Sequence, residues 1–200
     1  MEHSIRVCSG PGVAGHLGDA ANLRTSVFRE FPYLYEGDAA AEREYLAGYA
    51  GSPGSVFVLA EAEGMVVGVS TGLPLVAADP AFRQPFEAAG MNPAEWFYFG
   101  ESVLAREWRG RGIGHRFFDE REAHARSLGF ARICFCAVER STDHPLKPPG
   151  YRSNDAFWSR RGYVEQPGLK ARFAWRQVDS AGSEVMNELV FWIRETRGQM

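Results

Sequence analysis

Glycines and basic residues alternate in the segment 109–114, which reads Arg-Gly-Arg-Gly-Ile-Gly. Glycine lacks a Cβ, so this backbone can turn sharply and approach a ligand closely. The segment opens a predicted helix, where the N–H groups of the first turn lack intrahelical partners and attract negative charge. Its arginines add local positive charge to a chain whose formal net charge is -3. The pattern therefore predicts a cradle for a phosphate or pyrophosphate group.

Two common phosphate-binding motifs do not fit this segment. A P-loop requires Gly-Lys followed by Ser or Thr, and the sequence contains no such tripeptide. A dinucleotide fingerprint requires glycine where His115 stands, and an acidic residue about 20 positions further on, where Arg132 lies. These mismatches argue against a nucleotide-dependent oxidoreductase. The pattern that does fit this segment is Arg-x-x-Gly-x-Gly, placed directly after a predicted strand.

The bulk composition is that of one folded domain over residues 1–200. Hydrophobic residues make up 45% of the chain and charged residues 24%, which argues against disorder. The slightly acidic balance predicts no binding to nucleic acid or to an anionic membrane surface. No apolar run is long enough for a membrane span. The N-terminus also lacks a secretory signal pattern, so we expect a soluble cytoplasmic protein.

The three cysteines are Cys8, Cys134 and Cys136. An odd number with such spacing predicts reduced thiols rather than a disulfide framework. The last two alternate with apolar residues in a strand-like run, so we interpret them as small buried hydrophobes. No second cysteine pair or histidine cluster completes a zinc site, and we predict no metal.

The elements that must position the glycine motif follow from hydrophobic periodicity and from turn residues. We expect a helix that stops before Pro32, and a second helix that Asp38 caps. Residues 74–95 are interpreted as a surface excursion with a short helix. The expected strands are Ser4–Cys8, Ser55–Ala62, Met65–Leu73, Trp96–Leu104, Ala131–Val138, Leu169–Val178 and Met186–Arg194, and the later helices are Gly112–Leu128 and a short one ending at Gly162.

This order of elements indicates the fold class. Hairpins mixed with strand-helix-strand units predict an α/β (α+β) domain. We expect a central mixed, largely antiparallel twisted sheet with helices on both faces.

The glycine motif, in its strand-turn-helix setting, resembles the GNAT superfamily of N-acyltransferases. The similarity covers nearly the whole chain, is strongest from Phe97 to Phe130, and returns in the segment 156–163, Ala-Phe-Trp-Ser-Arg-Arg-Gly-Tyr. The resemblance implies acetyl-CoA as co-substrate and an amine of a small molecule or peptide as acceptor. It is also compatible with a homodimer.

The resemblance assigns cofactor-binding roles residue by residue. It implies that backbone N–H groups of the glycine motif hold the pyrophosphate, and that main-chain groups of Val103 and Leu104 bind the pantetheine arm. The Val103 N–H is the implied oxyanion donor, so Val103 also enters the catalytic set. The arm would lie in a gap between this strand and the strand Ala131–Val138. The cofactor-binding set is Val103, Leu104, Arg109, Gly110, Arg111, Gly112, Ile113, Gly114, His115 and Trp158.

Glu101 is the candidate general base. It lies two residues before Val103, on the same face of the strand, and a carboxylate in so aromatic a strand is costly without a partner or a task. The competing interpretation is an ion pair with an arginine, either Arg24 or Arg132. The sequence leaves both roles open.

Trp158 occupies the position at which the family usually has a tyrosine as general acid. An indole cannot protonate a thiolate, so Trp158 is interpreted as packing against the cofactor or the core. Tyr151, Ser153 and Tyr163 remain alternative proton donors. The tryptophan in place of the usual tyrosine also supports an alternative function, a non-catalytic acyl-CoA sensor with the same fold.

An aromatic loop lies between the first two helices. Its residues Phe31, Tyr33, Tyr35 and Glu36 either border the acceptor site, as in the family, or pack as a lid.

Overall fold

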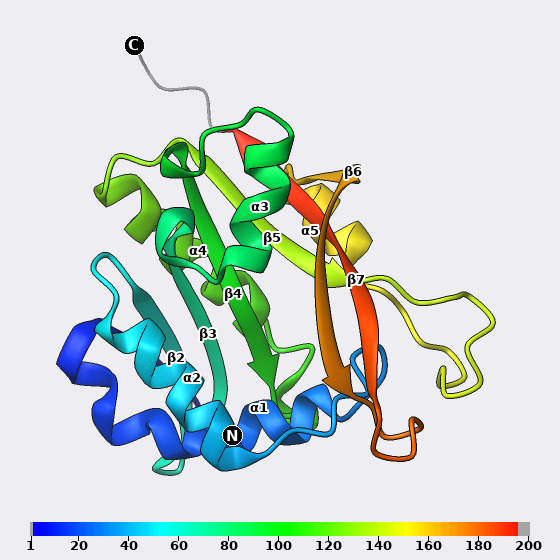
Figure 1. The fold of residues 1–200 in the computed structure, drawn as a ribbon. Coiled ribbons are helices and arrows are strands. Elements are labelled where there is room, and N and C mark those ends of the chain that lie inside the picture. Colours follow the sequence, from blue (N-terminus) through cyan, green and yellow to red (C-terminus); the bar gives the residue numbers. More distant parts are fainter. Residues whose placement is uncertain (1, 196–200) are drawn as a thin grey trace.

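A computed structural model describes residues 2–195. Its centre is one seven-stranded sheet in the order β1-β2-β3-β4-β5-β7-β6 (Figure 1). Only β4 and β5 run parallel, and every other neighbouring pair is antiparallel. The predicted fold class is therefore confirmed. The strands are β1 (Ser4–Cys8), β2 (Val56–Ala62), β3 (Met65–Pro74), β4 (Trp96–Leu104), β5 (Arg132–Val138), β6 (Val164–Arg176) and β7 (Glu184–Glu195).

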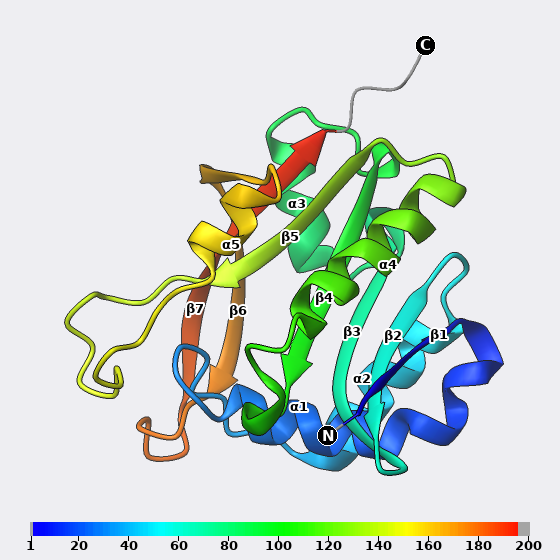
Figure 2. The ribbon, with the colours of Figure 1, turned by 180° about the vertical axis from the view of Figure 1, so that it is seen from behind.

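Helices cover both faces of the sheet. α1, α2 and α3 lie on one face, and α4 and α5 lie on the other (Figures 1 and 2). Each face has its own apolar core. The α-helices are α1 (Leu17–Phe28), α2 (Ala39–Gly51), α3 (Pro80–Ala88), α4 (Ile113–Ser127) and α5 (Asp155–Arg160), and the 3-10 helices are Gly10–His16, Leu75–Ala77, Pro93–Glu95 and Arg106–Trp108.

Among the described helices, none combines the length and the apolarity that a bilayer crossing requires.

Asp38 caps α2, as its position before the helical run predicted. Its carboxylate accepts hydrogen bonds from the N–H groups of Ala40 and Ala41, both at 3.0 Å. We therefore expect Asp38→Ala to lower the free energy of unfolding by about 1 kcal/mol, because these N–H groups lose their partner. Asp38→Asn retains an acceptor oxygen and should stay near the wild type. Urea unfolding followed by circular dichroism measures both, and an equal loss in the two variants would contradict capping.

The segment 74–95 is more than a surface excursion, which corrects the prediction. Its helix α3 lies on the sheet, with Phe82 only 8% exposed and Phe86 fully buried. These two side chains are four residues apart and therefore share one face of the helix. Pro85 lies inside the helix, and this breaker residue obscured the amphipathic pattern.

Two element boundaries differ more from the prediction than the others do. α1 ends at Phe28 rather than next to Pro32, because a proline disfavours helical backbone at the preceding residue and clashes with the carbonyl four residues earlier. The Phe28 carbonyl instead accepts from the N–H of Tyr35 at 2.8 Å. β6 begins at Val164, five residues before the predicted Leu169, and its pairing with β7 shifts register across Pro167 and Gly168.

Candidate active site

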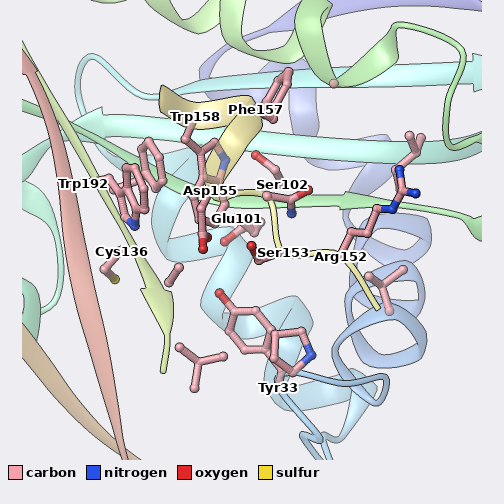
Figure 3. Close-up of a pocket in the computed structure, with 18 of the residues that line it drawn as sticks. Tyr33, Glu101, Ser102, Cys136, Arg152, Ser153, Asp155, Phe157, Trp158 and Trp192 are labelled. Atoms are coloured by element: carbon pink, nitrogen blue, oxygen red, sulfur yellow. The ribbon is translucent and has the colours of Figure 1, made fainter. Parts of the chain in front are cut away.

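A pocket opens where β4 and β5 separate. Their parallel pairing ends at Tyr98 and Cys134, and the two strands then diverge toward their carboxyl ends. The cavity measures about 1030 Å³ and extends from the loop after α1 to the start of α4. Figure 3 shows side chains from β4, β5, α5 and the flanking loops converging on it. The structure thus contains the gap that the resemblance implied.

A β-bulge interrupts β4 at the edge of this pocket. Ser102 pairs with Ser70 and Phe99 with Gly72, so two residues of β4 oppose the single Thr71 of β3. Such an extra residue disrupts the ladder locally and re-aims side chains. As a result Glu101 faces α1 and α2, while the side chain of Ser102 faces α4.

The ladder also fixes which N–H groups of β4 face the gap. The N–H of Ala105 donates to the Val67 carbonyl at 2.9 Å, and hydrogen-bonded pairs alternate along an antiparallel ladder. Val103, which is paired with Val69, therefore directs its N–H toward β3. This corrects the predicted oxyanion role of Val103, because the N–H groups that face the gap are those of Ser102 and Leu104.

The glycine motif forms the far end of the pocket. Gly110 and Gly112 have φ values of +77° and +81°, in the left-handed region that favours glycine. Both are exposed and line the pocket. A Cβ at either position would meet no described atom within 4 Å, so the space above the backbone is open. Gly112 is the N-cap of α4 and has no side-chain cap, so no capping side chain competes with an anion for the N–H groups of Ile113 and Gly114. The N–H of His115, which the resemblance also assigned to the pyrophosphate, already donates to the Gly112 carbonyl at 3.0 Å.

The side chains around the glycine motif have different roles. Ile113 is 1% exposed and anchors α4 in the core. Arg109 donates to the Leu104 carbonyl at 3.1 Å and pairs with Glu30 at 2.9 Å, which ties the motif to β4 and to the loop after α1. The guanidinium of Arg111 stacks on the Trp108 ring.

His115 lies beside α5. Its ring packs edge-on against Phe157 with centroids 4.9 Å apart, and its Nδ1 is 3.3 Å from Nη1 of Arg161. The motif and the later segment of the resemblance therefore meet in the fold.

Glu101 belongs to a buried ionic network. It pairs with Arg24 of α1, and Arg24 also pairs with Glu42 of α2. The Tyr35 hydroxyl donates to Glu42 at 2.7 Å. Of the two predicted arginines, Arg24 is therefore the partner of Glu101. The other oxygen, Oε1, is buried and has no hydrogen-bond partner among the described residues.

The second predicted arginine is engaged elsewhere. Arg132 pairs with Glu95 and, at 3.5 Å, with Glu195.

Trp158 lines the pocket and packs edge-on against Phe135 and Trp192, with centroids 5.0 and 5.2 Å away. Tyr163, one of the alternative proton donors, is 2% exposed and donates to Glu122 at 3.1 Å. That hydroxyl lies in the core and does not line the pocket, which excludes it as an acid there.

Tyr151 and Ser153 do line the pocket. Burial, and the nearby carboxylate of Asp155, raise the pKa of Tyr151, so its hydroxyl stays protonated at neutral pH.

Phe31 and Tyr33 of the aromatic loop line the wall opposite Trp158, whereas Tyr35 and Glu36 do not line the pocket. Figure 3 shows the Tyr33 hydroxyl pointing into the pocket toward Glu101 and Ser153. The Tyr33 carbonyl accepts from Arg140 at 3.0 Å and from Trp175 at 3.2 Å. Sequence reasoning missed these anchors, because more than 100 positions separate both from the loop.

Cys134 and Cys136 are buried, as predicted. Burial raises the pKa of Cys136 to about 12 and that of Cys134 well above its ordinary value. Both are therefore neutral thiols at physiological pH rather than nucleophiles.

Comparison with known proteins identifies the class of protein that this fold and site define. The model of the acetyltransferase (GNAT) family matches residues 21–147. The chain belongs to this family and is an acyltransferase whose co-substrate is acetyl-CoA. No curated protein matches the chain in sequence.

Solved structures of the family share the fold over almost their whole length. A ribosomal-protein-alanine N-acetyltransferase from Brucella melitensis has a TM-score of 0.63 at 17% identity, with 96% of this chain and 99% of that chain covered. A polyamine N-acetyltransferase from Drosophila melanogaster has a TM-score of 0.62 at 13% identity, covering 97% and 100%. A Salmonella typhimurium protein, solved with acetyl-CoA, has a TM-score of 0.60 at 10% identity, covering 100% and 97%.

Proposed function

We propose that the protein transfers the acetyl group of acetyl-CoA to an amine of a small molecule or peptide, by direct attack in a ternary complex. The observation that carries this proposal is the exposed, glycine-opened start of α4 at one end of the gap between β4 and β5. A pyrophosphate bound there would direct the pantetheine arm along β4 toward Ser102 and Glu101.

The chemistry needs a base and an oxyanion donor. In the proposed reaction the amine nitrogen bonds to the carbonyl carbon and the carbon–sulfur bond breaks. Glu101 takes the amine proton through Oε1, its unpartnered oxygen, while the Ser102 N–H stabilises the negative charge on the carbonyl oxygen. The thiolate leaves without a dedicated acid, because a thiol pKa of about 8.5 makes it a good leaving group. The thiolate then takes a proton from water and Glu101 returns its proton to water, which restores the carboxylate.

The acceptor is proposed to enter between the aromatic loop and α5. The two similar enzymes named above act on a ribosomal-protein alanine and on a polyamine, which supports testing both peptide and small-molecule amines. The three cysteines are all unpaired, and this supports a reducing compartment such as the cytoplasm. A homodimer remains part of the proposal.

A thiol-release assay with acetyl-CoA and a broad panel of amines tests the function. Amine-dependent release of free CoA, with an acetylated product in the mass spectrum, is the expected result. The second candidate is an acyl-CoA sensor, favoured by the tryptophan at position 158. Tight CoA binding without turnover on any amine would favour the sensor.

A further inference from the structure

A buried arginine of α4 donates hydrogen bonds to β3 and β4 at the β4 bulge, where the hydrogen bonding between these strands is interrupted. Arg121 is 1% exposed. Its Nη1 donates to the Thr71 carbonyl at 3.1 Å and to the Glu101 carbonyl at 3.4 Å, and its Nη2 donates to the Ser102 hydroxyl at 2.8 Å. One guanidinium therefore binds both sides of the break in the β3–β4 ladder.

This cation is costly to bury. Within residues 2–195, its hydrogen bonds go to carbonyl and hydroxyl oxygens and none goes to a carboxylate; the remaining one joins its Nε to the Phe117 carbonyl. Burial lowers its pKa to about 10, despite attraction from Tyr163 and Glu101. The rings of Phe99 and Phe118 lie 4.1 and 4.9 Å from the guanidinium carbon and offset part of this cost. At neutral pH the group remains charged.

The Glu101–Ser102 peptide connects this cation to the pocket. Arg121 donates to its carbonyl, and its N–H, on Ser102, points the opposite way into the gap. Hydrogen bonds in a chain polarise one another, so a cation on the carbonyl strengthens the N–H as a donor. The same contacts fix the direction of that N–H.

We propose that Arg121 is a positioning residue, which holds the β4 bulge and polarises the Glu101–Ser102 peptide as the oxyanion donor. The inference rests on the proposed acyl transfer. It adds a positive charge at the wall of the pocket that acts on the thioester carbonyl through the backbone.

The carbonyl stretch of bound acetyl-CoA reports this effect directly. With acetyl-CoA labelled with ¹³C at the thioester carbonyl, difference infrared spectroscopy should show a lower frequency when bound to the wild type than in water. In Arg121→Met the band should return toward the solution value. We expect kcat to fall about tenfold. The Kd of CoA should be unchanged, because CoA lacks the thioester carbonyl on which this N–H acts.

Two further variants keep the test decisive. Arg126→Met removes an exposed arginine of the same helix, which pairs with Glu122 at 4.0 Å, and should leave the band and kcat as in the wild type. If Arg121→Met does not fold, Arg121→Gln keeps a donor but loses the charge, and its band should also move toward the solution value.

A wild-type band and a wild-type kcat in a folded Arg121 variant would overturn the inference while leaving acyl transfer intact. Failure of the wild type to bind or turn over acetyl-CoA would instead refute the proposed function.

Discussion

Gly112→Val should raise the Kd of acetyl-CoA by about 100-fold, the effect of losing one or two hydrogen bonds to a charged group. At φ +81° a β-branched residue is strained, so the first turn of α4 must shift its N–H groups. The new side chain would also occupy the open space above the motif, where the pyrophosphate is proposed to lie. Isothermal titration calorimetry measures the affinity, and the KM for acetyl-CoA should rise in parallel.

The matched control is at the other end of the same helix. Gly129 follows α4 with φ +85° and equally open surroundings, so Gly129→Val introduces comparable backbone strain away from the pocket. Both variants should lose about 1–3 kcal/mol of stability, but only Gly112→Val should lose affinity for acetyl-CoA. Equal affinities in the two variants would show that the motif does not hold the cofactor.

Glu101→Gln should lower kcat by about 10²- to 10³-fold at neutral pH, the usual cost of removing a general base. The amide is nearly isosteric but cannot accept the amine proton. The Kd of acetyl-CoA should stay within about twofold, because Glu101 lies on the acceptor side of the strand and contacts no proposed phosphate ligand. Steady-state kinetics and calorimetry on one preparation separate the two effects.

Glu42→Gln separates chemistry from ion pairing. Glu42 shares Arg24 with Glu101 but does not line the pocket. Each substitution leaves Arg24 with one carboxylate, and we expect similar stability losses of about 1–3 kcal/mol. Only Glu101→Gln should lose most of its turnover. Equal losses of kcat in both variants would show that Glu101 acts only as a structural ion-pair partner and not as the base.

Local signals were strong where short-range chemistry determines the structure. The β4 strand, the glycine turn and α4 follow from alternation, positive φ at glycine and helix periodicity within residues 96–127. The Asp38 cap was predictable for the same reason, since a cap bonds only to its nearest neighbours.

Long-range pairings were not predictable in this way. Nothing local to Glu101 selects Arg24, which lies 77 positions earlier, over Arg132 as its partner. Arg121 sits in a charged stretch of α4 and looks like a solvated residue. Its burial depends on the β4 bulge, which hydrophobic alternation does not reveal, and the same bulge determined that the N–H of Ser102 faces the gap.

Calorimetry of the purified protein with CoA and with pantetheine tests the central claim most directly. The two ligands share the thiol arm, but only CoA carries the pyrophosphate and the nucleotide. We predict saturable binding of CoA, and binding of pantetheine at least about 100-fold weaker, since pantetheine has no anion for the start of α4. Absence of CoA binding, or equal affinity for the two ligands, would contradict the account.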